Sequence, residues 1–121
     1  DVFFAPHSRY STVETSHIRH NNALQLISES KDAGAYIIAS KDKKQIFVTG
    51  HSEYDSDTLK LEYDRDINLG KPIEIPKNYF KDDNPAKKPV VTWRSHANLL
   101  FYNWLNYYVY QTTPYNIDEI Q

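Results

Sequence analysis

Three short apolar runs follow one another in the first half of the chain, and they constrain the fold more than any other feature. They cover residues 23–28, 35–40 and 45–49, and only the short polar linkers 31–34 and 41–44 separate them. Strands joined by linkers of this length turn back on their neighbours. The sequence therefore predicts an antiparallel strand meander.

Two helices are predicted in the second half of the chain. The first is expected to be capped by Asp55 or Ser56 and to end at Gly70. Its apolar stripe consists of Leu59, Tyr63 and Ile67. The second is longer and spans residues 93–110. Its stripe consists of Ala97, Leu100, Phe101, Trp104, Leu105 and Tyr108. An aromatic stripe of this kind is typical of a core or an interface rather than a ligand pocket.

The beginning of the chain carries shorter signals. Residues 2–5 read as a short buried strand that Pro6 closes. Ser11, with a glutamate three positions later, matches the capping-box pattern, so a helix is expected to run through about Arg19. His17 and His20 are expected to face solvent on this helix.

Residues 71–89 carry four prolines and many charges, which predicts an irregular surface loop. Within it, residues 78–80 are expected to anchor the loop through two aromatic side chains.

Composition excludes several classes of function. The 121 residues are 40% hydrophobic, as expected for one folded domain, and 14 basic against 16 acidic residues give a net charge of −2, which argues against a nucleic-acid partner. No apolar stretch approaches a membrane span, and the first residues lack the basic and long apolar regions of a signal peptide, so we expect a soluble, cytoplasmic protein. The chain opens on Asp1 and contains no methionine, which predicts a fragment or excised domain.

His51 and Glu53 lie two positions apart where the third apolar run ends. Side chains at i and i+2 of an extended backbone point the same way, so Glu53 can accept a hydrogen bond from one imidazole nitrogen while the other acts as a base. This is the base and orienting acid of a nucleophilic triad. The chain contains no cysteine, so the nucleophile is either a serine or lies outside the chain.

Two other interpretations of this pair stay open on the residues alone. A histidine at a strand end is commonly a hydrogen-bonded structural residue. A metal site would use His51, Glu53 and His7, although no cysteine or third histidine falls at ligand spacing.

Longer strings in the chain strongly resemble the homoserine O-acyltransferases of methionine biosynthesis, the family of homoserine O-succinyltransferases and O-acetyltransferases. The strings are Ala-Pro-His-Ser-Arg-Tyr at 5–10, Phe-Val-Thr-Gly-His at 47–51, Glu-Tyr-Asp at 53–55, Ile-Pro at 75–76, Asn-Tyr-Phe at 78–80, Thr-Trp-Arg-Ser-His-Ala-Asn-Leu-Leu-Phe at 92–101, Asn-Trp-Leu-Asn-Tyr-Tyr-Val-Tyr-Gln at 103–111 and Thr-Pro-Tyr at 113–115. The resemblance covers nearly the whole chain but only the carboxyl-terminal part of that family's enzymes.

The resemblance implies an α/β fold, the carboxyl-terminal part of a class I glutamine amidotransferase-like (flavodoxin-like) domain, with residues 1–121 forming a single partial domain. It implies acyl transfer from succinyl-CoA or acetyl-CoA to L-homoserine through a cysteine thioester, with that cysteine outside this chain. The acyl-CoA is a substrate, and no cofactor or metal is expected. The family also implies a homodimer, and the fragment alone is expected to be inactive.

By motif, His51 resembles the triad base and Glu53 its orienting acid, while Ser8 and Arg65 resemble substrate-contacting positions. Ser52 stands where the family string has proline, which is expected to loosen the turn. On the residues alone, Arg65 would be a solvated partner of Glu62. Two other functions remain: a glutamine amidotransferase-type thiol hydrolase, and a non-catalytic dimerisation fragment whose surface is the aromatic last helix.

Overall fold

A three-stranded antiparallel sheet organises the fold. The computed structural model describes residues 2–119, and its strands β1 (Leu24–Ser30), β2 (Gly34–Ser40) and β3 (Ile46–Val48) lie in the order β1-β2-β3. The predicted meander is therefore confirmed. β2 is the central strand and the most buried of the three, because it has a partner on both edges.

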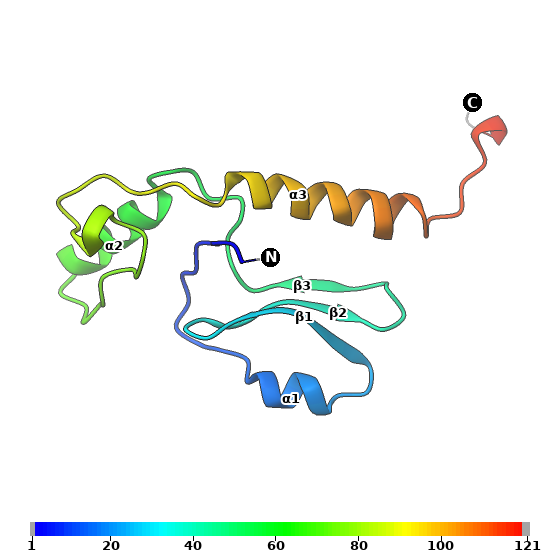
Figure 1. The fold of residues 1–121 in the computed structure, drawn as a ribbon, viewed down its shortest axis with the longest axis horizontal. Helices are drawn as coiled ribbons and strands as arrows, with labels where there is room; N and C mark the ends of the chain where they lie inside the picture. Colours follow the sequence, from blue (N-terminus) through cyan, green and yellow to red (C-terminus); the bar gives the residue numbers. More distant parts are fainter. Residues whose placement is uncertain (1, 120–121) are drawn as a thin grey trace.

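Helix α1 (Thr15–His20) covers one face of this sheet (Figure 1). Ile18 packs there against Ala35 and Ile38 of β2, and Leu24 and Leu26 of β1 surround this small cluster. The predicted capping box is wrong: the helix begins after Glu14, and no side chain caps its first turn. The two histidines of the helix, at positions 17 and 20, are exposed as expected.

The strand predicted over residues 2–5 is also wrong. Within the described residues this segment joins no sheet, and Val2 and Phe4 are exposed. The three strands of the meander pair only with one another, so this segment finds no strand edge beside it. Phe3 instead stacks on the ring of His96, with ring centroids 5.1 Å apart.

Helix α2 (Thr58–Asn68) ends as the sequence predicts. Gly70 adopts φ +71°, its N–H donates to Ile67 O at 2.9 Å, and the N–H of Lys71 donates to Asp66 O at 3.0 Å. This pair of bonds is the Schellman arrangement, which satisfies the last carbonyls of a helix and requires a left-handed residue.

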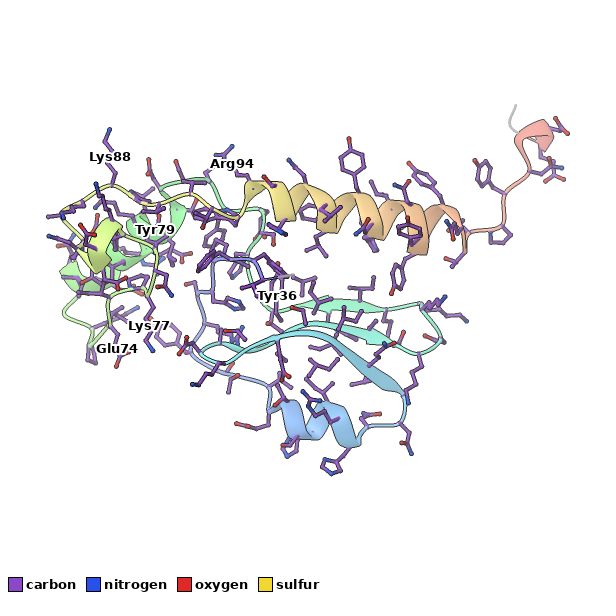
Figure 2. The ribbon with its side chains drawn as sticks, viewed as in Figure 1. Tyr36, Glu74, Lys77, Tyr79, Lys88 and Arg94 are labelled. Atoms are coloured by element: carbon purple, nitrogen blue, oxygen red, sulfur yellow. The ribbon has the colours of Figure 1, made fainter. Side chains whose placement is uncertain are left out.

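The start of α2 differs from the prediction. Neither Asp55 nor Ser56 caps it, and the N-cap residue, Asp57, makes no side-chain cap bond. The hydroxyl of Tyr79 satisfies the backbone there instead, since it donates to Ser56 O at 2.6 Å and accepts from the N–H of Lys60 at 3.1 Å. Figure 2 shows Tyr79 within the part of the molecule that α2 forms with the following loop.

The anchor predicted over residues 78–80 is confirmed. Tyr79 and Phe80 are buried and form a second small core with Leu59 and Trp93. The loop between them and the last helix contains a short 3-10 turn, η1 (Lys81–Asp83). This core is separate from the one under α1, so residues 2–119 contain two small apolar clusters rather than one.

The last helix is present over the predicted range but changes its pitch. It is an α-helix in α3 (Arg94–Trp104), continues as a π-helix in η2 (Leu105–Tyr110), and is followed by a 3-10 turn, η3 (Ile117–Glu119). The expected apolar stripe is mostly uncovered among the described residues, since only Ala97 is buried while Phe101 and Trp104 are exposed. The side of α3 nearest the sheet borders an apolar cleft of about 440 Å³, which also includes Ile27, Ile37 and Ile46 of the strands.

The chain thus has an α/β fold of one antiparallel sheet with helices. None of the described helices combines the length and apolar character needed to cross a membrane.

Replacement of Gly70 by alanine is expected to destabilise the protein by about 1 kcal/mol, because a left-handed conformation costs an L-residue about that much. No atom lies within 4 Å of the added methyl group, so the cost is conformational and not steric. Urea unfolding of the full-length parent protein measures it. Gly70→Asn is the matched control, and it should lose less because asparagine tolerates this conformation. Equal stability of the alanine variant and the parent protein would contradict the expectation.

Candidate active site

His51 lies on a short turn directly after the last strand. The N–H of Thr49 continues the pairing by donating to Tyr36 O at 3.0 Å, and the N–H of His51 then donates to Pro6 O at 2.8 Å. Gly50 lies between them in a space without room for a side chain: a Cβ there would approach the Tyr36 ring to 2.8 Å and Pro6 O to 2.9 Å. The close approach of the amino-terminal segment therefore fixes the backbone that carries His51.

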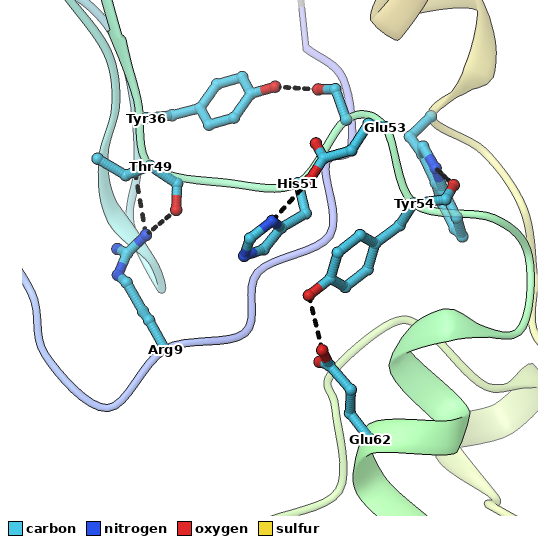
Figure 3. Close-up of polar contacts among 9 residues, drawn as sticks. Arg9, Tyr36, Thr49, His51, Glu53, Tyr54 and Glu62 are labelled. Atoms are coloured by element: carbon cyan, nitrogen blue, oxygen red, sulfur yellow. Dashed lines mark hydrogen bonds and ion pairs between the residues drawn. The ribbon is translucent and has the colours of Figure 1, made fainter.

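The imidazole of His51 and the carboxylate of Glu53 are hydrogen-bonded, with 2.9 Å between Nδ1 and Oε1 (Figure 3). An ionised carboxylate only accepts, so Nδ1 carries the proton of this bond, and Nε2 is the ring nitrogen available to act as a base in the neutral imidazole. Partial burial acts to raise the pKa of Glu53, but the hydrogen bond from His51 holds the pKa below its usual value. Glu53 is thus an anionic partner that orients the imidazole of His51.

The other face of the site is aromatic. The ring of Tyr54 stacks on the imidazole of His51, with centroids 4.3 Å apart and planes 16° apart. The Tyr54 hydroxyl donates to Oε1 of Glu62 in α2 at 2.8 Å. Burial, together with the hydrogen bond and charge of Glu62, raises the pKa of Tyr54 to about 12, so this hydroxyl keeps its proton.

Ser8 and Arg65 come together as walls of one open cleft of about 730 Å³. Ser8 comes from the amino-terminal segment and Arg65 from α2. Glu62 also lines this cleft, and its second oxygen, Oε2, is buried without a hydrogen-bond partner among the described residues. His51 is not part of the cleft wall, but Tyr54 connects it to Glu62.

The ion pair between Arg65 and Glu62 that the residues alone predicted does not form. The Nε of Arg65 donates to Oδ1 of its neighbour Asp66 at 2.9 Å, while Glu62 is engaged by Tyr54. Helical spacing brings residues 62 and 65 to the same side of α2, but the hydroxyl of Tyr54 is the group that binds Glu62.

Arg9 is the main feature that sequence reasoning missed. Its Nη1 donates to the carbonyl and the hydroxyl of Thr49, both at 3.0 Å, and to Nδ1 of His7 at 2.8 Å. Its Nη2 donates to the carbonyl of Ala33, in the turn between β1 and β2. The sequence indicated Arg9 only through its place in the string at residues 5–10. Neither its charge nor its spacing from other residues shows which groups it binds.

His7 is held neutral by its surroundings. Burial, followed by the nearby charges of Arg9 and His51, lowers the pKa of His7 to about 4. Since Arg9 only donates, Nδ1 of His7 is the acceptor and the proton lies on Nε2. The three-residue metal set considered from the sequence is not assembled: within residues 2–119, no three histidine or acidic side chains could hold a metal ion.

Ser52 does more than replace a proline. It is buried, and its Oγ forms a hydrogen bond with the hydroxyl of Tyr36, which lies between the sheet and the start of α3 (Figures 2 and 3). Burial raises the pKa of Tyr36. The turn that carries His51 and Glu53 is therefore tied to the central strand by a side chain at its own middle position.

The site thus contains a candidate base, His51, with an orienting acid, Glu53. The neighbouring cleft adds the guanidinium of Arg65 and the carboxylate of Glu62. These groups contain no thiol, because the chain has no cysteine.

Removal of the Ser52 hydroxyl in Ser52→Ala is expected to destabilise the protein by about 1–2 kcal/mol, because it leaves the buried Tyr36 hydroxyl without its partner. The matched double change with Tyr36→Phe should recover part of this loss, since both polar groups are then absent. Urea unfolding of the three variants in the full-length parent measures both values. Strictly additive losses would show that the two hydroxyls do not interact.

Comparisons with known proteins agree with the strings identified in the sequence. A family model described as homoserine O-succinyltransferase matches residues 1–115. A homoserine O-acetyltransferase from Clostridium acetobutylicum is 62% identical over 117 residues, which cover 97% of this chain and 39% of that relative. A homoserine O-succinyltransferase from Alteromonas mediterranea is 58% identical over 118 residues, which cover 98% of this chain and 38% of that relative. The chain therefore spans less than half the length of the relatives it matches, and it belongs to the homoserine O-succinyltransferase family.

Proposed function

We propose that this chain is part of a homoserine O-acyltransferase, which transfers an acyl group from an acyl-CoA to the hydroxyl of L-homoserine in methionine biosynthesis. The observation that carries the proposal is the His51–Glu53 hydrogen bond, which leaves one imidazole nitrogen basic. The names of the relatives supply the substrate and include both acetyl and succinyl donors.

His51 acts twice as a base in the proposed reaction. Its Nε2 first takes the proton of a cysteine thiol outside this chain, and the thiolate attacks the acyl-CoA carbonyl. CoA leaves with that proton and a thioester remains on the enzyme. Nε2 then takes the proton of the homoserine hydroxyl, the oxygen attacks the thioester, and the proton returns to the departing thiol. In both steps the carboxylate of Glu53 stabilises the imidazolium that forms.

The cleft beside this pair has groups that complement an amino acid. The guanidinium of Arg65 suits the α-carboxylate, because its fork binds two oxygens at once. Oε2 of Glu62 has no hydrogen-bond partner among residues 2–119, and the α-ammonium group would satisfy this buried oxygen. Ser8 lines the same cleft and can donate to or accept from the substrate.

We propose that the whole domain has the fold that the strings in the sequence imply. Residues 1–121 are then part of one catalytic domain of the class I glutamine amidotransferase-like fold, whose remaining part carries the cysteine on a strand-to-helix elbow. The acyl-CoA is a substrate in this reaction, so no cofactor is assigned. Acyl-CoA donors are cytoplasmic metabolites, and this supports a cytoplasmic enzyme.

We also propose that the full-length protein is a homodimer that uses the aromatic face of the last helix. Tyr102, Tyr107 and Tyr110 are exposed on α3 and η2. Exposed aromatic residues are enriched at interaction surfaces.

Replacement of Tyr107 by aspartate is expected to shift the full-length protein from dimer to monomer, because it places a charge in an apolar interface. Sedimentation velocity measures the mass of each form. Tyr115→Asp is the control, since Tyr115 is exposed outside the helix. A folded variant that remains a dimer would contradict the interface.

His51→Ala in the full-length parent is expected to abolish formation of O-acylhomoserine, because the alanine can accept no proton. Mass spectrometry after incubation with homoserine and each acyl-CoA measures the product and also identifies the donor. The isolated 121-residue chain is expected to form no product above background, since it lacks the thiol.

Unchanged product formation by the His51→Ala variant would make His51 a structural residue. Release of ammonia from glutamine by the wild-type protein, without acyl transfer, would instead indicate a glutamine amidotransferase-type hydrolase.

A further inference from the structure

One nearly buried carboxylate lies beside the proposed substrate cleft and does not belong to the catalytic pair. Asp66 is in the last turn of α2, and only 9% of its side chain is exposed. Three donors converge on it. Arg65 Nε and Lys71 Nζ bind Oδ1 at 2.9 and 3.0 Å, and the Tyr10 hydroxyl binds Oδ2 at 3.0 Å.

Arg65 and Lys71 are near Asp66 in the sequence, whereas Tyr10 comes from a distant segment. Tyr10 follows Ser8 by two residues, and although the tyrosine is 81% exposed, its hydroxyl bond to Asp66 joins this loop to α2. Lys71 lies 5.9 Å from the centroid of the Tyr10 ring and approaches Asp66 from the residue after Gly70. A single carboxylate therefore links the loop of Ser8 with the helix of Arg65.

The bond from Arg65 also determines how its guanidinium is presented. Asp66 occupies Nε, while both terminal nitrogens have no acceptor among the described residues. The side chain is 59% exposed and lines the cleft. Its two terminal nitrogens are thus free to bind both oxygens of a carboxylate end-on, and Asp66 limits the rotation of the fork.

We infer that Asp66 is a positioning residue for the amino-acid substrate: it aims the Arg65 fork at the substrate carboxylate and, through Tyr10, holds the Ser8 loop at the opposite wall. This inference rests on the proposed function, because it assigns the cleft to homoserine. The hydrogen bonds of Arg65 and Lys71 hold the pKa of Asp66 well below its usual range, so the carboxylate is charged whenever the enzyme works.

Asp66→Asn in the full-length enzyme tests this role, because asparagine keeps the shape but replaces one acceptor oxygen with a donor. The KM for homoserine is expected to rise about ten-fold, as for a misaligned substrate-binding group. The KM for the acyl-CoA and the rate of thioester formation, followed by mass spectrometry, should stay unchanged. Asp64→Asn is the matched control, because Asp64 lies on the same helix but pairs with Lys60 and should change neither constant.

A mutant cycle separates positioning from simple stabilisation. If Asp66 acts through Arg65, then Arg65→Gln combined with Asp66→Asn should raise the KM for homoserine no further than Arg65→Gln alone. Multiplying effects, or equal losses for both substrates, would overturn the inference.

Tyr10→Phe provides a second variant in case Asp66→Asn does not fold. It removes only the hydroxyl and should raise the KM for homoserine selectively; an unchanged KM would overturn the role of the loop. The wild-type enzyme is the reference for all variants. A wild-type protein that makes no O-acylhomoserine refutes the proposed function itself, whereas an active wild type with an unaltered Asp66→Asn variant refutes only the positioning role.

Discussion

The guanidinium of Arg9 holds together the parts on which the site depends. It binds the end of the last strand at Thr49, the first turn of the meander at Ala33, and the ring of His7. The segment it fixes supplies the carbonyl of Pro6 that binds the backbone of His51, and it carries Ser8 and Tyr10 into the cleft. Because the two apolar clusters are small and separate, such directional bonds, rather than a common core, determine how the sheet and α2 face each other.

The sequence was sufficient wherever the local signal and the tertiary contacts agreed. Short linkers can only produce a meander, and Gly70 is one of few residues that can end a helix in the left-handed conformation. The hydrogen bond between His51 and Glu53 was expected from their spacing, although it forms within a turn and not along the extended backbone from which it was argued. The predictions failed where a residue distant in the sequence supplies the hydrogen bond. Tyr79, and not a residue next to the helix, binds a backbone N–H group in the first turn of α2. Tyr54 binds Glu62, which was the partner expected for Arg65.

Other failures concern partners that the described chain does not provide. Residues 2–5 have the composition of a strand, but a strand forms only beside another edge. The stripe of the last helix has the periodicity of a core, yet among the described residues no strand packs directly against it. Its residues Leu100, Trp104 and Tyr108 instead face the sheet across an apolar cleft. Periodicity indicates which side of an element is apolar, but it does not show what lies against that side.

The stacking of Tyr54 on His51 has a consequence for the entropy of the proton transfer proposed above. An imidazole free to rotate samples several rotamers, and it must lose them when it aligns with a proton. Between the parallel Tyr54 ring and the Glu53 carboxylate, the ring is already confined to one plane and one direction. Much of the ordering that the proposed proton abstraction requires is therefore completed during folding.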